Sequence, residues 1–373
     1  MPKKDQLYEL IRSNPFISQQ DLAGHLGLSR SAVANYIATL VRERRILGRA
    51  YVLPDHRPVL CIGAANLDRK LRTSGKLALG TSNPARQSES FGGVARNIAE
   101  NLVRLGAPTA LITAVGADAS GHALLSHADE AGIDIRGALR VEGAASGTYT
   151  AVLDHDGEMR VALADMEIYE TLTPGFFVTR AQQRAGAALI VADLNLPREA
   201  LELLLQDSRR DGVPLVMVAV SEPKIGRLPR DLHGLRLLIL NLGELAARVG
   251  RPLATDADIG AACAELRRAG VQDVIVTRGA QGVMFTRGDA LHALPAQCAA
   301  AAPAPAAIVD VTGAGDAFAG AVCWTLYNGE PDLELACRRG QRLAAMTIAC
   351  AQTVAPQLAP GLFDSQPRDI VTA

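Results

Sequence analysis

From residue 59 onward, short apolar runs alternate with longer amphipathic stretches. The runs have the length and composition of buried strands, and the stretches between them repeat apolar residues at helical spacing. Strands that alternate with helices form a mostly parallel sheet with helices on both faces. The pattern therefore predicts an α/β fold for residues 58–373. The predicted strands are 59–63, 110–115, 188–192, 215–218, 237–240 and 274–277, and the predicted helices are 94–105, 122–131, 199–210 and 259–269.

Two regions interrupt this alternation. Residues 69–91 and 146–164 show polar alternation without long helical patterns, so we predict that they add strands that form a small β lid. The stretch 293–307 is rich in Ala and Pro and is expected to be a surface connection.

Residues 1–53 follow a different pattern, with three helical stretches and then a short hairpin at 46–53. The second helix starts after Ser18 and the third after Ser29, and serine is a preferred N-cap residue. Two helices joined by a tight turn and followed by a hairpin predict a winged helix-turn-helix domain. Residues 54–57 contain a proline and are expected to link it to the larger domain.

The N-terminal segment carries a local positive charge. It has eight basic and four acidic side chains, a net +4, whereas the whole chain carries −1. The segment resembles the DNA-reading domain of many bacterial regulators. The resemblance implies contacts to duplex DNA from Arg30, Ser31 and Asn35 on the recognition helix and from Arg49 at the hairpin tip. Because winged helices also serve as protein-interaction modules, a structural or dimerisation role stays open.

The overall charge and hydropathy exclude several functional classes. With 38 basic and 39 acidic side chains, the whole chain has no net charge that would attract a polyanion. No run reaches the roughly 18 apolar residues that span a bilayer. The first residues also lack the apolar stretch of a secretory signal, so we expect a cytoplasmic protein without a membrane partner.

The string D-V-T-G-A-G-D at 310–316 carries the strongest chemical signal. Gly313, Ala314 and Gly315 precede a predicted helix, where backbone N–H groups and the helix dipole favour an anion such as phosphate. Asp316 lies at the edge of this loop, where a carboxylate can accept a proton from a substrate hydroxyl. The string therefore predicts phosphoryl transfer with Asp316 as the base. Taken alone, it would also fit an Asp that caps a helix after a Gly-rich turn.

A second glycine signature, F-G-G-V-A-R-N-I-A, covers residues 91–99. Gly92 and Gly93 start a predicted helix and allow a polar ligand to approach the backbone. Asn97 follows one turn into that helix.

Together the two strings resemble the two signatures of the ribokinase-like (PfkB) carbohydrate kinase family. Three further strings agree with it, G-A-A-N-L-D at 63–68, N-L-G-E at 241–244 and T-R-G-A-Q-G at 277–282. The resemblance covers about residues 58–355. It implies a ribokinase-like fold, ATP and Mg²⁺ as cofactors, and a homodimer.

The resemblance also implies roles for individual residues. Glu244 would organise Mg²⁺ through water, and Asp310 would bind a monovalent cation such as K⁺. Residues expected at the acceptor are Asn66, Asp68, Gly92, Gly93 and Asn97. Residues expected at the nucleotide are Asn241, Glu244, Thr277, Gly279, Gly282 and Thr312.

A narrower set of strings is similar to the pseudouridine kinases: S-N-P at 82–84, D-H-D-G-E-M at 154–159 and A-D-M at 164–166. This similarity adds Ser82, Asn83, Asp165 and Lys224 to the acceptor site. It implies phosphorylation of the 5′-hydroxyl of pseudouridine. Asn-Pro and Asp-Gly are also ordinary turn dipeptides, so another nucleoside or a ribose-like sugar stays open as the acceptor.

One departure concerns the wall of that site. Pseudouridine kinases carry a V-D-P-V-S string here, whereas this chain has Val218-Ala219-Val220-Ser221, although Lys224 follows at the expected place.

A rival hypothesis makes the chain a transcription regulator whose kinase-like domain only senses a nucleoside. The intact loop with Asp316 argues against it, because a sensor needs no catalytic base.

Overall fold

The computed structural model describes residues 2–13, 17–43, 45–46, 57–296 and 308–364. The chain forms two compact units, Met1–Asp55 and His56–Ala373.

The first unit contains three helices, α1 (Lys3–Ser13), α2 (Gln19–Leu26) and α3 (Arg30–Arg42). Ser18 caps α2 by accepting a hydrogen bond from the Asp21 N–H, and Ser29 caps α3 in the same way. The predicted hairpin at 46–53, with Arg49, and the linker residues 54–56 lie almost wholly outside the described residues. The core of the unit consists of Leu7, Leu22, Ala23, Leu26, Val33 and Leu40.

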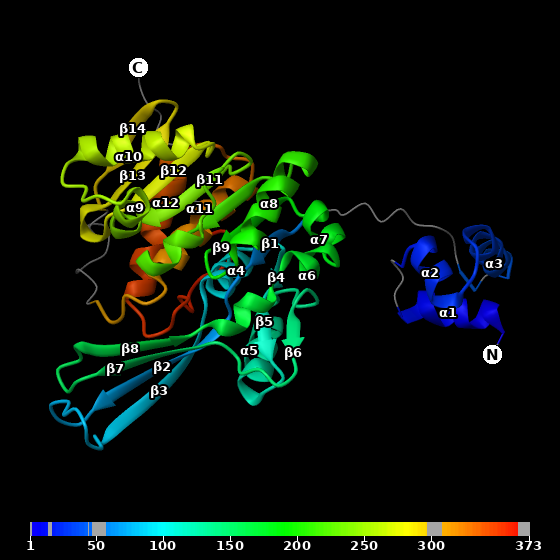
Figure 1. The fold of residues 1–373 in the computed structure, drawn as a ribbon, viewed down its shortest axis with the longest axis horizontal. Coiled ribbons are helices and arrows are strands. Elements are labelled where there is room, and N and C mark those ends of the chain that lie inside the picture. Colours follow the sequence, from blue (N-terminus) through cyan, green and yellow to red (C-terminus); the bar gives the residue numbers. More distant parts are fainter. Residues whose placement is uncertain (1, 14–16, 44, 47–56, 297–307, 365–373) are drawn as a thin grey trace. The chain divides into compact units, whose positions relative to one another are not determined.

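The second unit is built on one eight-stranded sheet in the order β14-β13-β12-β11-β10-β9-β1-β4 (Figure 1). The six strands from β12 to β4 pair in parallel, and β13 and β14 add an antiparallel edge. The predicted α/β fold is therefore confirmed. The strands are β1 (Val59–Ile62), β4 (Thr109–Ile112), β9 (Leu189–Asp193), β10 (Leu215–Val218), β11 (Leu237–Asn241), β12 (Asp273–Thr277), β13 (Val283–Arg287) and β14 (Ala290–Leu294).

Helices cover both faces of this sheet because its strands are apolar on both sides. In β1, Leu60 and Ile62 face one layer, and Val59 and Cys61 face the other. The first layer contains α6 (Pro174–Val178), α8 (Arg198–Asp211), α9 (Leu242–Val249) and α10 (Asp256–Arg268), with the short α7 (Ala181–Gly186) nearby. The second contains α4 (Val94–Arg104), α5 (Ala119–Glu130), α11 (Ala314–Tyr327) and α12 (Leu333–Ile348).

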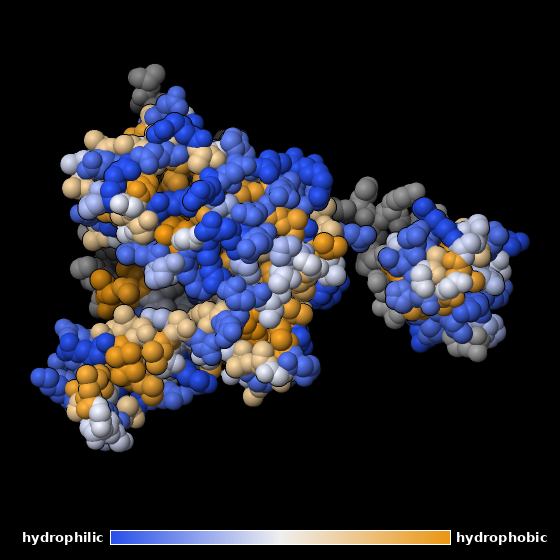
Figure 2. Space-filling view, in the orientation of Figure 1, coloured by the Kyte–Doolittle hydropathy of each residue, from blue (hydrophilic) through white to orange (hydrophobic). Residues whose placement is uncertain are grey.

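A separate four-stranded sheet extends from this body and forms a lid (Figure 1). Its order is β3-β2-β7-β8, and its members cover both regions that the polar alternation singled out. On β8, Met159, Val161 and Leu163 leave apolar side chains exposed, and Figure 2 shows apolar surface on the lid. The strands are β2 (Asn66–Thr73), β3 (Ala85–Gly92), β7 (Thr148–Leu153) and β8 (Met159–Asp165).

Two predicted boundaries were wrong. The predicted strand at 110–115 is two strands, because the chain leaves the main sheet after Ile112 and β5 (Ala114–Gly116) pairs with β6 (Leu139–Val141). Residues 293–294, expected in a surface connection, belong to β14, which pairs with β13. Among the described residues, no helix is long and apolar enough to cross a membrane.

Candidate active site

The carboxyl ends of the parallel strands bring the predicted strings to one edge of the sheet. Asn241 ends β11 and lies in register with Thr277, which ends β12. Asp193 ends β9, beside the end of β1. In open α/β sheets this edge is where ligands bind.

Asp193 joins three parts of this edge. Its carboxylate is buried and accepts hydrogen bonds from the N–H groups of Ala64 at 2.8 Å, Ala95 at 3.0 Å and Asn195 at 2.8 Å. Burial raises the pKa of this carboxyl group, although these N–H groups oppose the shift. Asp193 therefore holds the turn after β1 against the start of α4.

The paired glycines make room for neighbouring groups. A Cβ on Gly92 would lie 2.2 Å from a carboxylate oxygen of Asp68, and one on Gly93 would lie 2.4 Å from the Ala64 carbonyl oxygen. Asp68 is buried and accepts a hydrogen bond from the Asn66 side chain at 2.6 Å. The structure thus brings these four predicted acceptor residues together.

Asn97 and Asp316 connect the two glycine signatures. The Asn97 Nδ2 atom donates to Asp316 Oδ2 at 2.6 Å, which joins α4 to α11. Burial raises the pKa of Asp316 to about 7; the hydrogen bond from Asn97 opposes this shift, and the carboxylates of Asp193 and Asp68 add to it. A carboxyl group with a pKa near neutrality is suited to proton transfer.

The N-terminus of α11 has the features of an anion site. Gly313 caps it with φ 82°, and a Cβ there would lie 2.2 Å from the Thr353 carbonyl oxygen. Because the N-cap residue is a glycine, it offers no side chain to cap this end of the helix. Among the described residues beyond its own neighbours in the helix, a Cβ on Gly315 would meet no atom within 4 Å, so the space beside this backbone is open to a ligand. This arrangement fits a phosphate group.

Lys70 contacts the same loop and is a residue that sequence reasoning missed. Its ammonium group forms an ion pair with Asp310 Oδ2 and lies 3.3 Å from the Thr312 hydroxyl. Thr312 donates to the other oxygen, Asp310 Oδ1, from its N–H at 3.0 Å and its hydroxyl at 2.7 Å. Partial burial opposes ionisation of Asp310, but Lys70 and Thr312 outweigh it and lower its pKa.

Arg96 is a second residue that sequence reasoning missed. It is buried, and its guanidinium group donates to the carbonyls of Phe91 at 2.9 Å and Gly92 at 3.1 Å and to Glu100 at 2.6 Å. It also contacts the Asn97 Oδ1 atom. Because that oxygen meets the guanidinium group, the amide nitrogen of Asn97 is directed toward Asp316. The sequence alone does not single it out, because α4 also carries the charged residues Glu100 and Arg104.

The N-L-G-E string forms a capping box at the start of α9. Asn241 Oδ1 accepts from the Glu244 N–H at 2.9 Å, and Glu244 Oε2 accepts from the Asn241 N–H at 2.7 Å. Glu244 is buried; burial raises its pKa, and the nearby Glu222 carboxylate adds to the shift. Both side chains therefore already have a structural role at this edge.

The T-R-G-A-Q-G string is the turn from β12 to β13. Its centre is a 3-10 turn, Gly279–Gln281, closed by a hydrogen bond from the Arg278 N–H to the Gly282 carbonyl at 2.8 Å. Gly282 has φ 90°, and a Cβ there would lie 2.1 Å from the Leu294 carbonyl oxygen. Thr277 and Gly279 therefore lie at the same sheet edge as Asn241.

Lys224 lies on the wall of the site that departs from the family string. Its ammonium group donates to the Asn195 side-chain oxygen at 2.7 Å. Burial lowers the pKa of Lys224, and the charge of Arg227 adds to the shift. Because Asn195 lies two residues after Asp193, this pair adds polar groups near the end of β9.

The structure does not bring Ser82 and Asn83 to the cluster. The β2–β3 ladder runs from the Asn66–Gly92 pair to the Thr73–Ala85 pair, so the loop beyond it lies about 20 Å along the lid. Ser82 is exposed there, and the Asn83 side chain binds the backbone of its own loop at Ala78 and Thr81. Turn formation accounts for Asn83.

Asp165 also departs from its predicted role. On β8, Asp165 lies in register with Thr148 of β7, which in turn lies in register with Leu67 of β2. The next residue of β2, Asp68, lies in register with Tyr149 of β7 and through it with Ala164 of β8. Because successive side chains in a strand point to opposite faces, Asp165 belongs to the face opposite Asp68.

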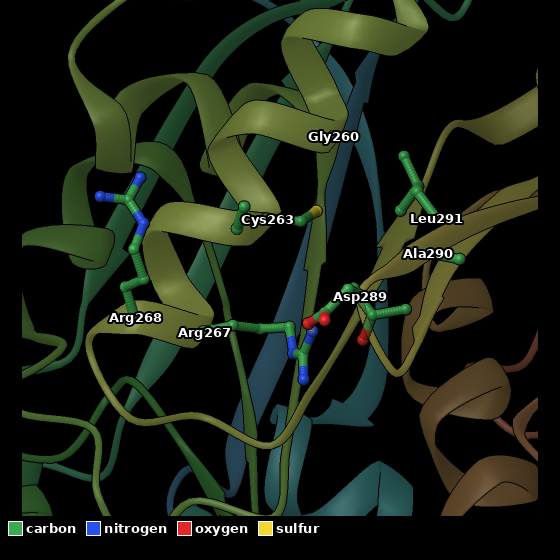
Figure 3. Close-up of a pocket in the computed structure, with 9 residues that line it drawn as sticks. Gly260, Cys263, Arg267, Arg268, Asp289, Ala290 and Leu291 are labelled. Carbon is green, nitrogen blue, oxygen red and sulfur yellow. Dashed lines mark hydrogen bonds and ion pairs between the residues drawn. The ribbon is translucent and has the colours of Figure 1, made fainter.

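A pocket of about 510 Å³ between α10 and β14 lies elsewhere (Figure 3). Arg267 enters it and donates to Asp289 at 2.8 Å and to the Gln272 carbonyl at 3.1 Å. Gln272 precedes β12, so this pocket lies at the amino end of β12, whereas Thr277 lies at its carboxyl end. It is separate from the cluster around Asp316.

A Gly-capped helix N-terminus beside a partly buried carboxylate, at the carboxyl edge of a parallel sheet and next to a β lid, is an arrangement suited to a small-molecule phosphotransferase. The family model described as pfkB family carbohydrate kinase matches residues 57–359. The chain belongs to this family of kinases. A second model, described as winged helix-turn-helix DNA-binding, matches residues 5–46, which confirms the predicted N-terminal domain.

Similar curated proteins support this assignment. The chain is 31% identical over 327 residues to an uncharacterized sugar kinase, YeiI, of Escherichia coli (strain K12), covering 88% of each chain. It is 32% identical over 302 residues to the pseudouridine kinase of the same organism, covering 80% of this chain and 93% of the relative.

Solved structures show the same fold. A carbohydrate kinase from Agrobacterium tumefaciens is 30% identical with a TM-score of 0.68, covering 81% of this chain and 94% of the other. Arabidopsis thaliana ribokinase, complexed with ribose and ATP, is 21% identical with a TM-score of 0.70, covering 82% and 96%. The ribokinase-like fold is therefore confirmed.

The raised pKa of Asp316 predicts a pH-dependent effect on stability. The folded protein holds this proton to higher pH than the unfolded chain does, so ionisation costs stability as pH rises from about 4 through about 7. Asp316→Asn cannot ionise. We expect the free energy of unfolding of this variant, relative to that of the wild type, to increase by about 1–3 kcal/mol between pH 5 and pH 8.5. The full effect is reduced because Asp316 has partial solvent contact.

Urea unfolding at both pH values measures this difference. Asp129→Asn, an exposed position on α5, is the control and should show no pH-dependent gain. An equal stability difference for Asp316→Asn at both pH values would contradict the raised pKa.

Proposed function

We propose that this kinase transfers the γ-phosphate of ATP to the 5′-hydroxyl of a nucleoside, with pseudouridine as the preferred acceptor. The observation that carries the proposal is the Asn97–Asp316 hydrogen bond beside the open N-terminus of α11. It places a carboxyl group of near-neutral pKa next to a site suited to phosphate. The 32% identity to a pseudouridine kinase supports the choice of acceptor.

Asp316 is the proposed general base. It accepts the proton of the 5′-hydroxyl as that oxygen attacks phosphorus. Asn97 holds the carboxylate in place, and Arg96 keeps the Asn97 amide in the orientation that donates to it. The N–H groups of Gly313, Ala314 and Gly315 are the proposed donors to the charge that develops during transfer; before a ligand binds, the Ala314 N–H donates to the Val311 carbonyl at 3.3 Å.

Asn66 and Asp68 are the proposed ribose ligands. They are hydrogen-bonded to each other, and Gly92 and Gly93 keep the backbone beside them free of side chains. A buried carboxylate can accept hydrogen bonds from sugar hydroxyls. Lys224 and Asn195 offer a donor and an acceptor on the neighbouring wall, where a nucleobase has both kinds of group.

Thr277, Gly279, Gly282 and Thr312 are the proposed nucleotide contacts. When bound, ATP supplies the phosphoryl group and Mg²⁺ offsets the charge of its phosphates. Glu244, whose Oε2 is engaged in the capping box, would orient Mg²⁺ through water from its other oxygen.

An acceptor panel tests the substrate. Pseudouridine and uridine differ in the glycosidic link and in one ring N–H. A site that pairs with this N–H is left with an unpaired buried group when uridine binds. We expect kcat/KM for pseudouridine to exceed that for uridine by at least about 100-fold.

Initial rates of ADP formation with pseudouridine, uridine, inosine and ribose measure this preference. Equal kcat/KM for uridine, or turnover with ribose alone, would reject pseudouridine as the preferred acceptor. The assignment of the chain to the kinases would stand in either case.

We further propose that residues 1–53 bind duplex DNA. Arg30, Ser31 and Asn35 are exposed at the start of α3, the second helix of the helix-turn-helix pair. Arginine and asparagine side chains at this place can contact bases and phosphates in the major groove. Arg49, in the predicted hairpin, is proposed as a further contact to the DNA backbone. The family model for this segment carries the description DNA-binding.

Gel retardation of the full chain on genomic fragments between 50 and 200 mM salt tests this proposal. We expect binding that weakens steeply with salt, and Arg30→Ala should weaken it further because one phosphate or base contact is lost. Arg12→Ala, an exposed position on α1, is the control. Equal weakening by both variants would reject Arg30 as a specific contact, and no binding by the wild type would make the domain an interaction module instead.

A further inference from the structure

The carboxylate that we expected to bind a monovalent cation is already paired with a cation from the protein. Asp310 Oδ2 forms an ion pair with the Lys70 ammonium group, and Asp310 Oδ1 accepts both hydrogen bonds from Thr312. The same ammonium group lies 3.3 Å from the Thr312 hydroxyl oxygen. Two oxygen ligands therefore surround one positive charge at the turn that leads into α11.

The backbone holds Lys70 firmly in this position. Lys70 lies in β2, which is an inner strand of the lid, and it is in register with Ser88 on β3 and with Ala151 on β7. Asp68 lies two residues earlier and so shares its face of the strand. One paired strand therefore carries both a proposed ribose ligand and the cation of the phosphate loop.

The loop needs a positive charge for an electrostatic reason. Asp310 is partly buried and lies three residues before Gly313, at the helix end where we expect the phosphates. A carboxylate there repels a phosphate unless a cation neutralises it. Lys70 supplies a single positive charge without the entropic cost of capturing an ion from solution.

We propose that the Lys70 ammonium group replaces the monovalent cation of this loop, so that the kinase does not depend on K⁺. Lys70 neutralises Asp310 and stabilises the Asp310–Thr312 turn from which α11 begins. The proposal rests on the phosphate-binding role proposed above for this loop. It also predicts that removing the ammonium group creates a site for a free cation between Asp310 and Thr312.

Turnover of the full chain with KCl or with tetramethylammonium chloride at equal ionic strength tests the proposal. We expect the wild type to differ by less than about twofold between the two salts. Lys70→Met, which keeps the length of the side chain without its charge, should lose about 10- to 100-fold in tetramethylammonium and recover with K⁺. Lys76→Met, an exposed position in the β2–β3 loop, is the matched control and should behave as the wild type.

Thermal unfolding gives a second measurement that does not require turnover. The Tm of Lys70→Met should rise when K⁺ replaces tetramethylammonium, whereas the Tm of the wild type and of Lys76→Met should not. A wild type that requires K⁺, or a folded Lys70→Met whose turnover and Tm ignore K⁺, would overturn the proposal. If no nucleoside is phosphorylated, the Tm comparison still decides whether Lys70 replaces the cation. Failure of the Lys70 proposal is therefore distinguishable from failure of the proposed function.

Discussion

The hydrogen bond between Asn97 and Asp316 is the contact on which the proposed chemistry depends. It joins two helices whose N-termini carry the two glycine signatures, and it crosses 219 residues of sequence. Asp193 and Arg96 hold the α4 side of this contact in place, because each buried group bonds several backbone atoms around the turn before the helix. The Asp316 carboxylate, the proposed base, is thus held by a network of buried hydrogen bonds.

The carboxyl groups of the site differ in the direction in which their surroundings shift their pKa values. Asp68 and Asp316 are carboxyl groups whose pKa values burial raises, and Arg96 opposes this shift at both. Asp310 has a lowered pKa because Lys70 and Thr312 outweigh its partial burial. Asp316, with a pKa of about 7, is therefore divided between its neutral and ionised forms near pH 7 and can exchange a proton, while the lowered pKa of Asp310 keeps that carboxyl group ionised.

Much of this architecture follows from local sequence patterns. Alternating strands and helices predicted the α/β fold, and the strings around Gly92 and Gly313 predicted the two helix N-termini that the structure brings together. Lys70 and Arg96 could not be found in this way. Lys70 meets a partner 240 residues later in the chain, and Arg96 is one of three charged residues on α4, so the pattern of the helix does not mark it as buried. Ser82 and Asn83 show the opposite error, because a turn dipeptide has no information about strand register.

The pH dependence of kcat/KM, measured with excess Mg²⁺ for the wild type and for Asp316→Asn, tests the central claim most directly. If Asp316 is the base, kcat/KM of the wild type should rise with pH through an apparent pKa of about 7. Asp316→Asn should lose at least about 100-fold in kcat and should lack that pH dependence, while Asp129→Asn keeps both. More than half of wild-type turnover in folded Asp316→Asn, with the same pH profile, would contradict the account.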